Sequence, residues 1–346
     1  MPGMKAIAVM QGGQPVASNV EIIEIEPPTP DRGEVLVRTE SSALNHLDLW
    51  VGMGIPGVER SWPRVTGSDG VGIVEKIGPG VNEAWLGRRV IMNAAVEVEH
   101  AHYPDLAPAG EDLGMIGEHV AGSMAEMFVA PVGNVLDIGE SDAVSAAAFG
   151  LAHLTAWRMI RTRARLRSGE WVLIPGIGGG VATAALGIAK HLGARIVVTS
   201  RHASKLERAM ELGADATVLD EGVDWSREVR RITGKRGVDL CIDSVGKAVH
   251  LACIKSLARG GRFVTCGCTS GADPATDLAR VFWNQLSILG STMGDMDEFR
   301  EVVHLFKTGC LSPVIDGVYP WQRGAEAWAR LEAGDQCGKL VIDWTA

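Results

Sequence analysis

The chain has 346 residues, of which 46% are hydrophobic and 22% are charged, with 43 glycines and a formal net charge of −9 at pH 7. This length exceeds one ordinary core and favours two domains of a globular α/β protein. The acidic balance disfavours a nucleic-acid partner, no apolar run is long enough to span a membrane, and no signal peptide is recognisable, so we expect a cytoplasmic protein.

The first 150 residues predict a mostly β domain. Short β runs broken by Gly and Pro occupy residues 4–10, 19–28, 33–44, 70–78 and 88–93.

One stretch of this domain, "SSALNHLDLWVG" (41–52), places Asn45, His46 and Asp48 almost side by side. Three interpretations are open: a metal site, an acid–base pair, or a polar kink in which Asn45 and Asp48 bond backbone groups while Trp50 packs.

A strand–glycine loop–helix–strand pattern begins at Glu170 with "EWVLIPGIGGGVATAALGIAKHLGARIVVTSR". A pyrophosphate needs close approach to backbone N–H groups at a helix N-terminus, which glycines permit. The pattern therefore predicts a dinucleotide site. The residues expected to form it are Gly176, Gly178, Gly179, Gly180 and Val181.

The second strand of this unit ends in Ser200 and Arg201, where an NAD site usually carries Asp or Glu. A guanidinium there pairs with a 2′-phosphate, and Lys205 adds charge. NADP(H) is therefore favoured over NAD(H). The alternative is that Arg201 is only a solvated residue and that Ser204 caps the next helix with Glu207.

The α/β alternation continues with predicted strands at 238–246, 261–268 and 286–293. The carboxyl ends of strands in a doubly wound sheet face the cofactor crevice. The residues expected there are Val245, Gly267 and Thr292.

Several motifs in fixed order run along nearly the whole chain: "MKAIAV", P-x-P-x-x-G-E-V-L-V-R (Pro28 to Arg38), "ALNHLD", "GSDGVGIVEKIGPGV", "HLTAW" and "GKLV". Together they resemble the medium-chain dehydrogenase/reductase (MDR) superfamily, which includes zinc alcohol dehydrogenases and zinc-independent quinone oxidoreductases. The resemblance implies a mostly β, GroES-like catalytic domain over 1–152, completed by 293–346, and a doubly wound Rossmann cofactor domain over 153–292.

Carried over residue by residue, the ligand positions of the catalytic zinc fall on Asn45, Ser68 (followed by Asp69) and Leu151, four residues before Thr155 on the nicotinamide side. None of the three supplies the nitrogen or sulfur ligand that tetrahedral zinc needs. We therefore expect no catalytic zinc.

The lobe that holds a structural zinc in some relatives corresponds to residues 93–119, which contain no cysteine. His100, His102 and His119, with neighbouring carboxylates, leave an adventitious metal site conceivable. Solvated loop residues are the better interpretation.

The resemblance places Asn45, His46 and Asp48 on the wall of the active cleft. Asn45 would donate its amide to a carbonyl, His46 would relay a proton or hold the cofactor phosphate, and Asp48 would orient His46 or a Lys or Arg beneath the site. Trp50, Trp62 and Trp283 suggest a pocket for a hydrophobic substrate.

The leading hypothesis is an NADPH-dependent, zinc-independent reductase of a conjugated carbonyl, either an enone or a quinone. The alternatives are a metal-free carbonyl reductase/alcohol dehydrogenase and a non-catalytic NADPH-binding protein. Residues 286–293 pair across a two-fold axis in relatives, so we expect a homodimer or homotetramer.

Overall fold

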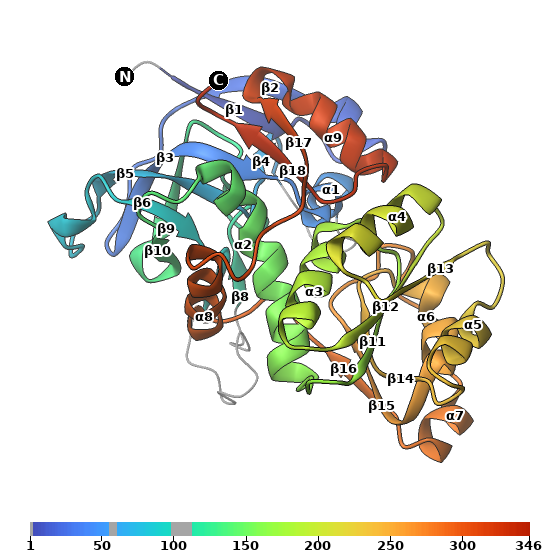
Figure 1. The fold of residues 1–346 in the computed structure, drawn as a ribbon. Coiled ribbons are helices and arrows are strands. Elements are labelled where there is room, and N and C mark those ends of the chain that lie inside the picture. The colour runs from blue at the N-terminus through green and yellow to red at the C-terminus, as the bar shows by residue number, and fades with distance from the viewer. Residues whose placement is uncertain (1–2, 55–60, 98–112) are drawn as a thin grey trace. The chain divides into compact units, whose positions relative to one another are not determined.

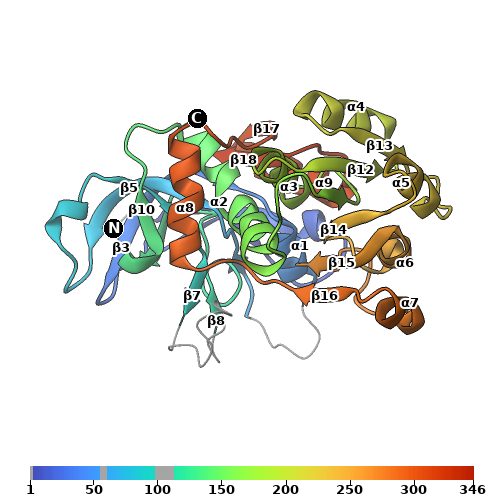
Figure 2. The ribbon, with the colours of Figure 1, turned by 60° about the horizontal axis from the view of Figure 1, so that its bottom comes forward.

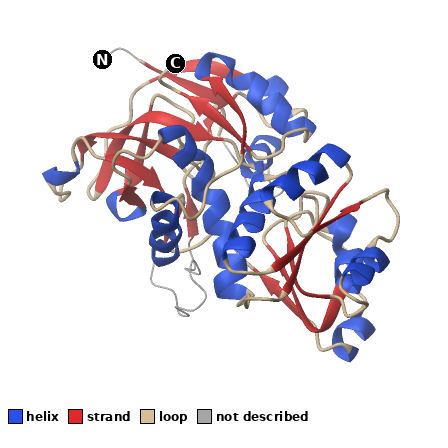
Figure 3. Ribbon diagram, in the orientation of Figure 1, coloured by secondary structure: helices blue, strands red, loops and turns tan. Residues whose placement is uncertain are grey.

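The computed structural model describes residues 3–54, 61–97 and 113–346. They form two compact units. The first, here called the β-rich unit, comprises Met1–Leu151, Gly294–Gly309 and Pro313–Ala346; the second, the parallel-sheet unit, comprises Ala152–Met293 and Cys310–Ser312. The mixed α/β fold class predicted from the sequence is confirmed (Figure 3).

The described residues of the β-rich unit form three sheets. A three-stranded sheet has the order β2-β1-β4, a two-stranded sheet pairs β7 with β8, and a seven-stranded sheet has the order β10-β6-β5-β3-β18-β17, with β9 also paired to β3. The strands are β1 (Met4–Val9), β2 (Val20–Ile25), β3 (Glu34–Ala43), β4 (Arg64–Val65), β5 (Gly70–Ile77), β6 (Arg89–Met92), β7 (Ala95–Glu97), β8 (Leu113–Met115), β9 (Met127–Pro131), β10 (Val135–Asp137), β17 (Ile315–Pro320) and β18 (Lys339–Asp343).

The α-helices that accompany these strands in the described part of the unit are α1 (His46–Met53), α2 (Ala143–Trp157), whose last six residues belong to the parallel-sheet unit, α8 (Met296–Lys307) and α9 (Gly324–Ala333). The core against β1 includes Ile7, Leu44, Trp328 and Leu340. Residues from both ends of the chain therefore share one core, which is why β18 lies beside β3 (Figure 1).

The parallel-sheet unit is built on a six-stranded sheet of order β13-β12-β11-β14-β15-β16, in which every pairing is parallel. Its strands are β11 (Trp171–Ile174), β12 (Arg195–Ser200), β13 (Ala216–Leu219), β14 (Val238–Asp243), β15 (Leu257–Thr265) and β16 (Ser287–Gly290). The strand order reverses direction at β11, between β12 and β14, and such a switch point opens a crevice at the carboxyl ends of the strands.

Helices cover both faces of this sheet (Figure 1). They are α3 (Gly180–His191), α4 (Ala203–Leu212), α5 (Ser226–Ile232), α6 (Lys247–Ser256) and α7 (Leu278–Trp283), and a π-helix over Arg158–Arg163 continues α2. The helix α3 forms because small and aliphatic residues recur on one face, and it buries seven of its residues, including Ala185 and Ile188.

The predicted strands are present, with shifted ends: the run predicted over 261–268 begins at Leu257, and the one over 286–293 is reduced to Ser287–Gly290. Among the described residues, none of the helices combines the length and the apolar character that crossing a bilayer requires.

Candidate functional site

Strand register brings together three polar residues that lie far apart in the sequence. The antiparallel pairing of β18 with β3 matches Val341 to Ala43, so that Lys339 lies opposite Asn45 two positions further on. On the other side of β3, Ser42 pairs with Gly70, and Asp69 immediately precedes that pair.

A hydrogen-bond network, here called the Asp69 network, joins these side chains. Lys339 Nζ donates to Asn45 Oδ1 at 2.5 Å and to Asp69 Oδ2 at 2.9 Å. Asn45 Nδ2 donates to Asp69 Oδ2 at 2.8 Å, and the Leu151 N–H of α2 donates to Asp69 Oδ1 at 2.6 Å. The Lys339 and Asp69 side chains are 4% and 1% exposed, so the network is a buried ion pair.

Asn45 therefore has its amide directed to protein acceptors, Asp69 and more distantly the Ala43 carbonyl oxygen at 3.5 Å. The sequence predicted that this amide would donate to a substrate oxygen. The structure shows that Asn45 links α1 to the Asp69 network, and donation to a substrate oxygen stays a prediction.

Asp48 bonds backbone groups, which is the third of the interpretations left open by the sequence. Its carboxylate accepts from the Asn45 N–H at 2.7 Å and from the Gly67 N–H at 2.9 Å. The side chain is buried, and desolvation raises its pKa even though these hydrogen bonds and the charge of Lys339 act in the opposite direction. Among the hydrogen bonds of the described residues, none joins Asp48 to His46, so the predicted orienting role stays a prediction.

His46, the first residue of α1, is exposed. Its ring meets the half-buried Trp50 one turn later edge to face, with ring centroids 5.3 Å apart. Desolvation by the surrounding groups lowers the pKa of His46 below its ordinary value of 6.5, so the neutral form predominates at pH 7.

The three tryptophans assigned to a substrate pocket lie in different environments. Trp50 is on α1, whereas Trp62 packs against the core that includes β1. Trp283 ends α7 in the other unit and is 72% exposed, beside the exposed Phe282. The structure therefore does not enclose Trp283 in a pocket of its own unit.

The glycine loop has the geometry expected at a phosphate site. Gly176 has φ +63° and Gly178 has φ +139°, both conformations that favour glycine, and Gly179 is the N-cap of α3. A Cβ on Gly176 would lie 2.7 Å from Val245 Cγ2, so the loop passes close to the end of β14. Gly180 and Val181 follow as the first residues of α3, with their N–H groups at its positive end.

The end of β12 carries the residues that bear on cofactor choice. Ser200 is buried and its Oγ accepts from the His202 N–H at 3.1 Å, while Arg201 is exposed. Lys205 lies in the first turn of α4. Ser204 lies inside α4 and the N-cap is His202, so the alternative in which Ser204 caps this helix is wrong.

The neighbouring strand ends are ordered by Asp243, at the end of β14. Its carboxylate accepts from the Val245 and Gly246 N–H groups at 3.0–3.2 Å and from Thr265 Oγ1 at 3.2 Å. The Gly267 carbonyl oxygen lies 3.0 Å from the same hydroxyl, whose single proton goes to one of these two acceptors at a time.

Two further predicted cofactor residues have different exposures. Thr155 is buried and donates to Met293 Sδ at 3.9 Å, whereas Thr292 is exposed.

The predicted alternative of a metal site in the 93–119 lobe falls mostly outside the described residues, since His100, His102 and the carboxylates between 99 and 112 are not described. His119 is described, and its Nδ1 accepts from the Met115 N–H at 3.1 Å. Within residues 3–54, 61–97 and 113–346, no group of three or more His, Cys, Asp or Glu side chains is placed to hold a metal ion.

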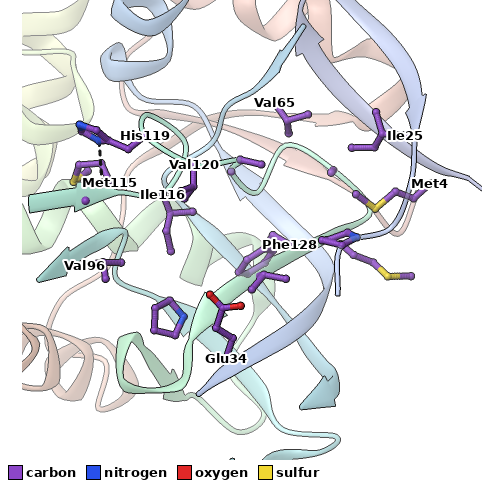
Figure 4. A pocket seen from close by; sticks show the side chains of 18 of the residues that line it. Met4, Ile25, Glu34, Val65, Val96, Met115, Ile116, His119, Val120 and Phe128 are labelled. Atoms are coloured by element: carbon purple, nitrogen blue, oxygen red, sulfur yellow. Dashed lines mark hydrogen bonds between the residues drawn. The ribbon is translucent and has the colours of Figure 1, made fainter. Parts of the chain in front are cut away.

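A cavity of about 460 Å³ lies in the β-rich unit. Its lining is mainly apolar and includes Met4, Ile25, Val65, Ile116 and Phe128 (Figure 4). His119 lines this cavity, whereas the residues predicted for the catalytic, substrate and cofactor sites do not.

Lys339 is the principal residue that sequence reasoning missed. The "GKLV" motif contains it, but the motif served only to mark a return to the first domain. A lysine at the start of an apolar strand was the available signal, because a buried ammonium requires a partner.

Comparisons with known proteins agree along the whole chain. Residues 31–140 match the family model described as alcohol dehydrogenase GroES-like domain, and residues 180–308 match the one described as zinc-binding dehydrogenase. An alcohol dehydrogenase of Geobacillus stearothermophilus is 28% identical over 348 residues, which cover 98% of this chain and 99% of that protein. A quinone oxidoreductase of Rattus norvegicus is 24% identical over 348 residues, with 98% and 97% covered. The crystal structure of an NAD-dependent alcohol dehydrogenase is 36% identical in sequence and has a TM-score of 0.92. The match covers 98% of this chain and 99% of that one.

Proposed function

Because the chain belongs to the medium-chain dehydrogenase/reductase superfamily of nicotinamide-dependent oxidoreductases, we propose that it is an NADPH-dependent reductase of conjugated carbonyls, enones or quinones, that works without a catalytic zinc. The observation that supports the proposal is the Asp69 network, which engages Asn45 and Leu151, two of the three positions onto which the resemblance carries the zinc ligands.

The donor set does not fit a catalytic zinc. Asn45 and Leu151 are engaged with Asp69, and Ser68 Oγ donates to the Ile116 carbonyl oxygen at 2.9 Å. The buried ammonium of Lys339 lies beside Asn45, where a second cation would be repelled. The proposed reaction therefore involves no metal ion.

A bound nicotinamide cofactor would supply the hydride, and the chain's residues would position the substrate and supply a proton. The glycine loop and the N-terminus of α3 would hold the pyrophosphate, since both favour a close anion. Hydride added to the electron-poor carbon of an enone leaves an enolate, which then takes one proton. His46 is exposed at the start of α1, so it or bound water is the proposed proton source.

Arg201 and Lys205 support the preference for NADPH, because a 2′-phosphate pairs well with a guanidinium and an ammonium. No carboxylate occupies the end of β12, where Ser200 lies. The solved relative is named as NAD-dependent, so the preference depends on these side chains of the present chain.

A metal-free carbonyl reductase/alcohol dehydrogenase is the second candidate, favoured by the relatives named alcohol dehydrogenase. It requires the same cofactor site, but hydride goes to the carbonyl carbon and the proton to its oxygen.

The test is rapid-mixing measurement of NADPH oxidation by chelator-dialysed protein against enones, quinones and aldehydes, with zinc content measured in parallel. We expect turnover of enones or quinones with less than stoichiometric zinc. Turnover of aldehydes alone would favour the second candidate. NADPH binding by fluorescence titration with no turnover of any class would instead indicate a non-catalytic cofactor-binding protein, and activity that requires added zinc would contradict both enzymatic proposals.

We also propose that the chain forms a homodimer or homotetramer through β16. This strand is at the edge of the parallel sheet with α7 next to it (Figure 2), and Leu278, Phe282, Trp283 and Ile288 are exposed there. An exposed edge with apolar side chains favours pairing with another strand.

A further inference from the structure

Asp69 is the centre of the buried network that precedes α1. Its two oxygens accept three hydrogen bonds, from Asn45 Nδ2, Lys339 Nζ and the Leu151 N–H. These donors come from the residue before α1, from the start of β18 and from α2, so a single carboxylate ties three separate segments together.

Lys339 bonds both Asp69 and Asn45. It donates to Asn45 Oδ1, so the Asn45 carboxamide is held at both its oxygen and its nitrogen. An amide held at both ends has one orientation, and a reversed amide would place its NH₂ against the ammonium.

Stability alone does not account for this pair. A buried ion pair contributes little net stability compared with apolar side chains of similar volume, because both charges lose their hydration. What distinguishes the pair from an apolar contact is that its hydrogen bonds are directional.

We propose that Lys339 and Asp69 are positioning residues of the reductase site: by fixing the Asn45 carboxamide they fix the first turn of α1 and therefore the ring of His46. The inference rests on the proposed function and deepens it. Few residues separate the network from the His46 ring. Asn45 is the N-cap of α1, His46 follows it directly, and the Asn45 N–H donates to the Asp48 carboxylate.

Charge-removing variants separate positioning from stability. Lys339→Met or Asp69→Asn alone leaves a buried partner unpaired, so each should lower both the melting temperature and kcat. The double variant Asp69→Asn/Lys339→Met removes both charges and should recover much of the melting temperature. Its kcat should stay at least about tenfold below wild type, with KM for NADPH changed less than about twofold, because misplacement of a reacting group costs rate rather than cofactor affinity.

Gly150→Ala tests the same idea with every charge retained. A Cβ at Gly150 would lie 2.3 Å from Asp69 Oδ1, so the alanine must displace the carboxylate. We expect a lowered kcat here as well. The matched control is Lys5→Met/Glu24→Gln, which removes an ion pair of the same 2.9 Å length whose side chains are 42% and 58% exposed, and which should leave kcat unchanged.

A readout independent of activity keeps this inference distinct from the proposed function. The NMR signals of the His46 imidazole, assigned with His46→Gln, are sensitive to the Trp50 ring 5.3 Å away. They should move in the double variant and in Gly150→Ala, and not in the control. If the wild type is inactive toward all carbonyls while the double variant and Gly150→Ala show these shifts, the proposed function is removed and the positioning role is kept. Unmoved signals with wild-type kcat in the double variant would overturn the inference.

Discussion

His46 is the residue whose chemistry is most open to direct test, because it is exposed and titrates below its ordinary pKa of 6.5. A proton donor acts in its protonated form, so kcat/KM should fall as the pH rises through a midpoint below 6.5. His46→Gln should flatten that profile and lower kcat by about 10²-fold or more.

The pH-rate profiles of wild type and His46→Gln check this prediction. The free energy of unfolding should depend on pH in the opposite sense to activity. Because folding lowers the pKa of His46, protonation of the ring opposes folding, and the contribution of His46 to stability is lost as the pH falls through the folded pKa. An unchanged profile in His46→Gln would assign the proton to water.

At the same scale, we expect Arg201 to decide between the two nicotinamide cofactors. Arg201→Gln should raise KM for NADPH by about tenfold or more, since a charge-assisted hydrogen bond contributes about 1.5–3 kcal/mol, and should change KM for NADH little. Arg208→Gln on α4, where the exposed arginine pairs with Glu211, is the control. Equal effects on both cofactors would mean that Arg201 does not contact a 2′-phosphate.

At the scale of elements, the strand–loop–helix around α3 was predictable because its signals are local. The glycine spacing and the helical periodicity are both found within one segment of about 30 residues, so they can be recognised without knowing which distant segments pack against it. The Asp69 network was not predictable in the same way. It depends on the register of β18 against β3, which joins side chains 294 positions apart. The sequence therefore contained no sign that the Asn45 amide donates to Asp69, and its predicted donation to a substrate stays a prediction.

Two glycines of the same βα unit should respond to alanine in opposite ways. Gly176→Ala places a Cβ in a residue with φ +63° and 2.7 Å from Val245, and should destabilise the protein by about 1–2 kcal/mol or more and weaken NADPH binding. Gly187→Ala in α3 meets nothing within 4 Å and should stabilise by about 1 kcal/mol. Denaturant unfolding measures both, and destabilisation by Gly187→Ala would show that α3 packs more tightly there than described.

At the scale of the whole molecule, the edge strand β16 predicts the state of association. Ile288→Lys places a charge on this edge, and Phe282→Ser removes an apolar side chain from α7 beside it. Either change should lower the mass measured by light scattering toward that of one chain. Ile22→Lys, at an exposed position of β2, is the control and should not. A wild-type protein of single-chain mass would contradict the proposed assembly.

The pairing of β18 with β3 also sets an order of events during synthesis. Asn45 and Asp69 leave the ribosome long before Lys339, which is made only after the entire parallel-sheet unit between them. Until then the Asp69 carboxylate lacks its cation, and the β-rich unit lacks both β17 and β18. The nascent N-terminal segment should therefore remain open to protease while the cofactor-binding segment already resists it, so that folding closes the molecule from its middle outward.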